Sequence, residues 1–422
     1  MQNETSLQAT YHRIAIAVEA NLKQHVLNTW FPRSVDEDYG GFNQFFREDW
    51  SQEEIATRSL VYQSRLTWVA AKAAKRCADK DSYFPAIAMH GMRFLRETFW
   101  DEANGGLHWA LNANGCPMPF KHTYGIAFAI YASAATFDLT LNDSSLGLAR
   151  NAFAWLDKHA FDFENGGYFE ALDVTGKPIR GPEDAPDSLV YGLRPGKDAI
   201  GTVYGLKSMN THIHLLEAFS ALYEVWPLPK LGSRLHHLYD TLMEKVIHPD
   251  GYLHLYFQPD WTVIPSEDSY GHDIETAFLL VEAAQALDIP DDSRTWKIAR
   301  QIVDHTLSVG WDETYSGLYG DGDPVTGPTR PDQKRKGWWE QAESLNALLL
   351  MHERFGSETD RYWNAFLKQW AFIEAHQVDP KYGGWYHTLS REGIPPPGAR
   401  KSDAWTDPYH QGRALMNVAD RL

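Results

Sequence analysis

Apolar residues recur along most of the chain at spacings of three and four, which is the period of an amphipathic α-helix. About twelve such stretches can be traced between turn-forming segments. They lie near residues 7–31, 57–78, 81–98, 120–138, 144–160, 209–225, 229–247, 271–287, 291–308, 337–355, 357–376 and 407–421. The chain is therefore predicted to be all-α.

A glycine turn followed by an aromatic residue or leucine recurs six times, and between successive turns lie two predicted helices. The turns are at residues 39–42, 104–107, 165–168, 250–252, 316–318 and 382–385. Successive turns are 61 to 67 residues apart, except for the third and fourth, which are 84 apart. We therefore predict one domain over residues 1–422, made of six helical hairpins.

Six helical hairpins can stack as an open solenoid or close into a ring. An open array needs polar capping repeats, whereas the first helix (Ile14, Val18, Leu22) and the last (Leu415, Val418) both keep apolar faces. Closure is favoured, which predicts an (α/α)6 barrel of six inner and six outer helices with short hairpin loops at one mouth.

The longest spacing contains an insertion at residues 173–207 that is rich in Gly, Pro and Asp. Long loops without a helical period are often functional, so we expect this loop to cover one mouth of the barrel. A solvated decoration without a function is the alternative interpretation.

Composition narrows the class of partner. The 422 residues carry a net charge of −17 without a cluster of Lys and Arg, which disfavours nucleic acid and anionic membranes as partners. Residues 1–20 lack the basic flank and apolar run of a signal peptide and no run of 18 apolar residues occurs, so neither export nor membrane spanning is expected. Two cysteines, Cys77 and Cys116, are too few for a disulfide framework. A cytoplasmic location is expected. Sixteen tryptophans suit either a sugar-binding cleft or a large core.

The helix after each turn should take the same inner position, so the residues at the six helix starts should converge on one mouth. Asn210 and His214 share one helix face, whereas His212 points about 200° away. His272 and Glu275 are neighbours at i, i+3, as an imidazole and its orienting carboxylate should be. The other polar and aromatic residues at these starts are Arg65, Tyr124, Trp338, Trp339, Glu343, Trp405 and His410.

Two chemistries fit these residues. Three histidines with a glutamate can bind Zn²⁺, and imidazoles without a metal can act as general acid and base near neutral pH. The sequence contains no nucleophile elbow and no phosphate-binding loop.

Four motifs in order resemble the N-acylglucosamine 2-epimerase superfamily, and within it the branch of cellobiose and mannose 2-epimerases. They are MNTHIH at 209–214, GHDIE at 271–275, WWEQAE at 338–343 and DPYHQGRA at 407–414. The resemblance implies an (α/α)6 barrel that inverts C2 of a reducing aldose without a metal or another cofactor.

The resemblance also implies a role for each candidate residue. His272 and His410 would be the acid/base pair at C2, with His214 as a third imidazole near O1 or the ring oxygen. Arg65 would face the enediolate, and Glu275 would hold His272. The sugar would be bound by Tyr124, Asn210, Trp338, Trp339, Glu343 and Trp405.

The insertion and the segment KSDAWTD at 401–407 depart from the pattern of the disaccharide enzymes, which favours D-mannose and D-glucose as the substrate pair. Cellobiose epimerisation and aldose–ketose isomerisation of mannose remain alternatives within the superfamily. Two alternatives belong to other classes. One is an inverting glycoside hydrolase using carboxylates such as Glu275, Glu343 and Asp407, and the other is a non-catalytic sugar-binding module. The expected partner is a small neutral sugar.

Overall fold

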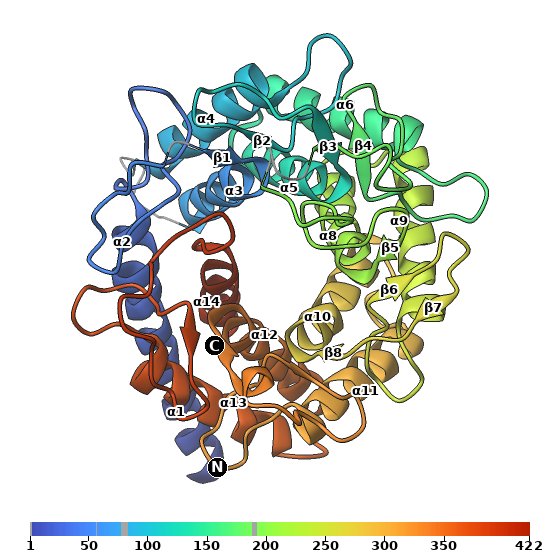
Figure 1. Cartoon of the computed structure of the whole chain (residues 1–422). Helices are drawn as coiled ribbons and strands as arrows, with labels where there is room; N and C mark the ends of the chain where they lie inside the picture. The colour runs from blue at the N-terminus through green and yellow to red at the C-terminus, as the bar shows by residue number, and fades with distance from the viewer. Residues whose placement is uncertain (1, 56, 77–82, 188–191) are drawn as a thin grey trace.

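The helices form two concentric rings, as the computed structural model shows for residues 2–55, 57–76, 83–187 and 192–422 (Figure 1). The inner ring contains α3 (Leu60–Arg76), α5 (Thr123–Thr140), α8 (Met209–Val225), α10 (Tyr270–Ala286), α12 (Trp338–Phe355) and α14 (Tyr409–Arg421). The outer ring contains α1 (Gln2–Asn21), α4 (Phe84–Phe94), α6 (Asp143–His159), α9 (Pro229–Thr241), α11 (Ser293–Val309) and α13 (Arg361–Phe372). Four of the outer helices, α1, α4, α9 and α13, are extended by short π-helical segments. These segments are Leu22–Leu27, Leu95–Phe99, Leu242–Val246 and Ile373–Gln377.

The ring closes because the last inner helix packs against the first. Each inner helix contacts the next, and α14 contacts both α12 and α3, with α1 packed on its outer side. Inner helices are enclosed by neighbours, and α5 accordingly buries all of its first fourteen residues. Outer helices such as α11 bury one face only. The predicted barrel of six inner and six outer helices is confirmed for the described residues.

The predicted helices agree closely with the observed ones. Residues 77–78 and 81–82 of two predicted helices, Cys77 among them, and residues 188–191 of the insertion lie outside the described residues. In the described ranges, none of the helices combines the length and apolar character needed to cross a bilayer.

Short antiparallel strands connect neighbouring repeats at one end of the ring (Figure 1). The strand that leads into an inner helix pairs with a strand from the following hairpin. The pairs are β1 (Arg58–Ser59) with β2 (Ala110–Leu111), β3 (Phe120–His122) with β4 (Ala171–Asp173), β5 (Lys207–Ser208) with β6 (Tyr256–Phe257), β6 with β7 (Val263–Ile264), β8 (Asp268–Ser269) with β9 (Asp321–Gly322), and β10 (Lys336–Gly337) with β11 (Thr388–Leu389). The pairs of β1, β3, β5, β8 and β10 thus lead into five of the six inner helices, all except α14 among the described residues.

A buried ion pair holds five of the six glycine turns against the chain that leads into the inner helix. In the second repeat, Lys121 Nζ lies 2.7 Å from Asp101 Oδ2, and Asp101 Oδ1 also accepts hydrogen bonds from two backbone N–H groups of its own turn. The other four pairs are Arg58–Asp36, Lys207–Asp162, Lys336–Asp312 and Lys401–Asp379. These pairs fix the end of the barrel where the inner helices begin.

Candidate active site

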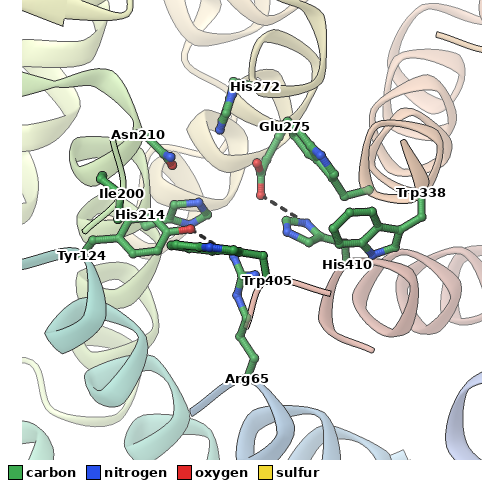
Figure 2. A pocket seen from close by; sticks show the side chains of 11 residues that line it. Arg65, Tyr124, Ile200, Asn210, His214, His272, Glu275, Trp338, Trp405 and His410 are labelled. Carbon is green, nitrogen blue, oxygen red and sulfur yellow. Dashed lines mark hydrogen bonds and ion pairs between the residues drawn. The ribbon is translucent and has the colours of Figure 1, made fainter. Parts of the chain in front are cut away.

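The starts of the inner helices surround a cavity of about 210 Å³. Ten of the eleven predicted site residues line it: Arg65, Tyr124, Asn210, His214, His272, Glu275, Trp338, Trp339, Trp405 and His410. Figure 2 shows these side chains directed from different helices toward one space. The eleventh, Glu343, does not line the cavity.

His214 is oriented by a carboxylate on its own helix. Its Nδ1 donates to Glu217 Oε2 at 3.0 Å, because an ionised carboxylate can only accept. Burial alone would favour neutral Glu217, but the Arg413 guanidinium and the His214 hydrogen bond lower the pKa of Glu217 to about 2. His214 Nε2 is therefore left free for a ligand.

His410 is oriented by Glu343 from the neighbouring helix α12. The distance between His410 Nδ1 and Glu343 Oε1 is 2.8 Å, and Arg413 Nη2 lies 2.7 Å from the same oxygen. That oxygen accepts from both groups, so His410 carries its proton on Nδ1 and leaves Nε2 unprotonated. Glu343 was predicted to bind the sugar, but it is fully buried, contacts His410 and does not line the cavity.

Glu275 was predicted to hold His272, and here the structure differs. His272 Nδ1 lies 2.7 Å from Ser269 Oγ, whereas the Glu275 carboxylate pairs with Arg413 and lies 3.9 Å from His410 Nδ1. The spacing of i, i+3 does place Glu275 beside His272, but a full positive charge from Arg413 attracts the carboxylate more strongly than a neutral imidazole does.

Burial keeps two of the imidazoles uncharged. It lowers the pKa of His272 to about 4, and it lowers the pKa of His410 well below its ordinary value, helped by the nearby Arg65 and Arg413 charges. Both rings are therefore neutral at pH 7, which is the state that a general base requires.

Arg65 supplies a fixed positive charge in the cavity. Its guanidinium is 3.2 Å from Asp407 Oδ2, donates to the Tyr124 hydroxyl at 3.1 Å, and lies over the Phe128 ring at 4.3 Å. Burial opposes this charge, but Tyr124, Asp407 and the nearby Tyr409 raise the pKa of Arg65 above its ordinary value. The group can therefore stabilise negative charge that develops on a bound ligand.

Aromatic rings form the remaining walls of the cavity. Trp339 lies with its ring centroid 4.8 Å from that of His272 and 5.6 Å from that of His410. Trp405 lies 6.3 Å from Tyr124, in front of the cavity in Figure 2. Flat apolar faces beside polar groups are typical of sugar-binding sites.

Sequence reasoning missed Arg413, which contacts Glu217, Glu275 and Glu343 together. Its position three residues after His410 in the same helix was a usable signal, since residues at i, i+3 share a face.

Ile200, from the predicted insertion, was also missed and reaches the cavity. Asp198 holds it by accepting the Ile200 N–H at 3.1 Å and by contacting His122 Nε2 at 3.1 Å. His122 in turn accepts the Tyr124 N–H, so the insertion is connected to the start of α5.

His212 was predicted to point away from the site, and it does. Its Nε2 accepts the Tyr168 N–H at 3.0 Å and its Nδ1 contacts the Ser208 carbonyl, so both ring nitrogens serve the fold. Burial lowers the pKa of His212 to about 3.

The carboxylates near the cavity do not have the arrangement of an inverting glycoside hydrolase. Inverting hydrolases hold two carboxylates about 6.5–9.5 Å apart across a cleft. Here an oxygen of Glu275 and an oxygen of Glu343 lie within 4.8 Å of each other and of His410, and Arg413 binds both carboxylates. Asp407 is committed to Arg65. Because Arg413 already neutralises this group, it is also a poor metal site.

Imidazoles, a guanidinium and tryptophans around one cavity of a helical barrel are suited to binding a sugar and transferring its protons. The chain belongs to the N-acylglucosamine 2-epimerase (GlcNAc 2-epimerase) family, whose model matches residues 40–184 and 197–414. It is thus an isomerase-class enzyme. The unmatched residues 185–196 fall inside the predicted insertion.

Individual relatives are similar over almost their whole length. A cellobiose 2-epimerase from Bacteroides fragilis is 30% identical over 411 residues, covering 95% of this chain and 97% of the relative. A D-mannose isomerase from Marinomonas mediterranea is 24% identical, covering 95% and 97%. The solved structure of cellobiose 2-epimerase from Spirochaeta thermophila superposes with a TM-score of 0.85 at 28% identity, covering 99% and 98%.

Proposed function

We propose that this enzyme inverts C2 of D-mannose and D-glucose through an enediolate, with histidines as the proton-transfer groups and without a catalytic metal. The observation that carries the proposal is the cavity itself, where three imidazoles and one guanidinium from four inner helices meet. Removal of a proton next to an aldehyde requires a neutral base and a fixed donor or charge at the developing oxyanion.

In the proposed mechanism, His272 and His410 act on C2 from different sides. They project into the cavity from α10 and α14 (Figure 2). One neutral imidazole removes the proton from C2 and becomes an imidazolium. The negative charge of the enediolate raises the proton affinity of the other ring, which takes up a proton from solvent at its free nitrogen and delivers it to the opposite face of C2, and the first ring then returns its proton to solvent. Arg65 and Tyr124 would stabilise the enediolate oxygens, and His214, fixed by Glu217, would bind O1 or the ring oxygen.

The size of the cavity supports a single sugar ring as the substrate. About 210 Å³ is smaller than the 300–1,000 Å³ typical of sites for drug-sized ligands. Ile200 and Trp405 border the space. They belong to the insertion and to the segment KSDAWTD, whose departure from the pattern of the disaccharide enzymes favoured a monosaccharide.

Incubation with mannose in D₂O tests the reaction. The expected product is glucose with deuterium at C2, detected by NMR. Accumulation of a ketose alone would contradict epimerisation and support aldose–ketose isomerisation. His272→Ala and His410→Ala should each lower turnover by more than about 10³-fold. His236→Ala, on the exposed face of outer helix α9, is the matched control.

The second candidate is a cellobiose 2-epimerase, in keeping with the names of several relatives. A wider cleft of about 1090 Å³ lies between residues 331–335 and 387–396. Its wall includes His387, whose ring centroid is 4.4 Å from that of Trp338 in the smaller cavity. A second sugar unit leaving the cavity past Trp338 would find space there. A value of kcat/KM about tenfold higher for cellobiose than for mannose would establish this candidate and reject the monosaccharide proposal.

A further inference from the structure

The fourth repeat lacks the ion pair that holds the other five glycine turns. Arg58, Lys121, Lys207 and Lys336 each stand two residues before an inner helix and neutralise a buried aspartate. Two residues before α10 stands Asp268 instead, and His248 occupies the place of the turn aspartate. A carboxylate therefore replaces an amine at this position.

A second carboxylate, Asp273, adds to this difference. In three other repeats an uncharged residue of the inner helix, namely Gln63, His212 or Gln341, accepts the backbone N–H that follows the turn glycine. In the fourth repeat the corresponding bond comes from the Leu253 N–H, two residues after Gly251, and Asp273 Oδ1 accepts it at 3.1 Å. The fourth repeat thus has two adjacent acids where its neighbours have a cation and a neutral acceptor.

Both acids are buried and incompletely satisfied. The exposed fraction is 1% for Asp268 and 0% for Asp273. Asp268 Oδ1 and Asp273 Oδ2 have no hydrogen-bond donor among the described residues, and the ion-pair contacts described for these acids involve only His305. Two buried carboxylates without a compensating charge are strongly unfavourable.

The geometry around these acids suits a metal ion. His305 Nε2, from α11, lies 3.0 Å from Asp268 Oδ2 and 3.9 Å from Asp273 Oδ2. Tetrahedral ligands at about 2.0–2.1 Å from a zinc ion are about 3.3–3.4 Å apart, so the observed separations lie on either side of the required value. An ion in this position would neutralise both carboxylates.

Two other clusters of His, Asp and Glu already have compensating partners. Backbone N–H groups, the Thr211 hydroxyl and the His122 imidazole contact the carboxylates of Glu170 and Asp198. Arg413 neutralises the cluster around His410. The Asp268 cluster differs from both because His305 and the Leu253 N–H leave one oxygen of each aspartate without a donor among the described residues.

We propose that Asp268, Asp273 and His305 form a structural binding site for a divalent transition-metal ion such as Zn²⁺, with water completing the coordination. The imidazole favours such an ion over Mg²⁺ or Ca²⁺, which prefer oxygen ligands alone. The three residues belong to β8, α10 and α11. Asp268 is followed directly by Ser269, which holds the His272 ring, so the ion would stabilise the segment that orients His272.

Metal content after equilibration tests the proposal. The full chain is equilibrated with ZnCl₂ at pH 7.5 and desalted, and bound zinc is measured by elemental mass spectrometry. We expect about one zinc per chain and a higher Tm with zinc than after chelation. Asp268→Asn and His305→Gln should each lose the zinc and the rise in Tm, because each removes a ligand while preserving side-chain size.

The matched control is Asp198→Asn, which alters a buried His–Asp contact outside the proposed site and should retain zinc. Less than about 0.1 zinc per wild-type chain would overturn the proposal and leave the two aspartates sharing a proton. Full zinc content in both ligand variants would also overturn it and indicate an adventitious ion only. If a variant fails to fold, the wild-type zinc content and Tm still decide.

Discussion

Glu343→Gln tests whether the carboxylate behind His410 contributes to proton transfer. The amide keeps the size of the side chain but loses the charge, 2.8 Å from His410 Nδ1, that stabilises an imidazolium. At an effective dielectric constant of about 20, two unit charges at this separation attract by about 6 kcal/mol. Arg413, 2.7 Å from the same oxygen, offsets part of this attraction. We expect about 3 kcal/mol to remain, which corresponds to a decrease in kcat on the order of 10²-fold.

The assay is C2 epimerisation in D₂O, with kcat and KM measured separately. Glu343 does not line the cavity, so KM should change little. Glu340→Gln is the matched control and should leave kcat unchanged. Glu340 contacts neither His410 nor Arg413 in the described ion pairs, and burial raises its pKa to about 8, so that the amide replaces an acid that is largely uncharged at pH 7. A Glu343→Gln enzyme with kcat within about threefold of wild type would refute the reasoning, as would an effect confined to KM.

Three further predictions concern pH, substrate size and stability. Burial lowers the pKa of His272 to about 4, and a general base acts when it is neutral. We therefore expect kcat/KM to stay high as the pH falls from 7 toward 5 and to decrease near pH 4. A decrease centred near pH 6.5 would contradict this expectation. Ile200→Gly removes the side chain that borders the cavity, and Asp198→Asn weakens the hydrogen bond that holds Ile200 in place. Each variant should therefore raise the ratio of kcat/KM for cellobiose to kcat/KM for mannose. An unchanged ratio in both variants would show that Ile200 does not limit substrate size. Lys401→Met should lower the unfolding free energy by about 3–5 kcal/mol in urea titrations, because it leaves the buried carboxylate of Asp379 unpaired. Adding Asp379→Asn should restore part of that loss. If wild type and Lys401→Met are equally stable, the ion pair does not stabilise the fold.

The barrel was predictable because its signals are local and repeated. Helical periodicity and glycine turns each occupy a few residues, and six copies in order leave few other architectures. The turn glycines have a physical requirement that explains their recurrence: Gly41 and Gly384, for example, have φ of +68° and +75°, which L-residues rarely adopt. The convergence of the inner-helix starts follows from the same repetition, so the location of the cavity was accessible from sequence.

The contacts inside the site were less accessible, because they join helices far apart in the chain. Spacing within one helix correctly put Asn210 and His214 on one face, but it also suggested that Glu275 holds His272. That expectation failed because Arg413 reaches Glu275 from across the ring, 138 residues further along the chain. Ile200 lies in a segment without helical or strand period, so no pattern could place it at the cavity.

Arg413 explains why the three imidazoles cannot be treated as independent groups. One guanidinium binds Glu217, which orients His214, and Glu343, which orients His410, while its contact with Glu275 brings a third carboxylate within 3.9 Å of His410. A change in the charge of any one carboxylate therefore alters how strongly Arg413 compensates the other two, and with them the pKa of His410. The tuning of the proposed base thus depends on a residue behind the cavity as much as on the residues that line it.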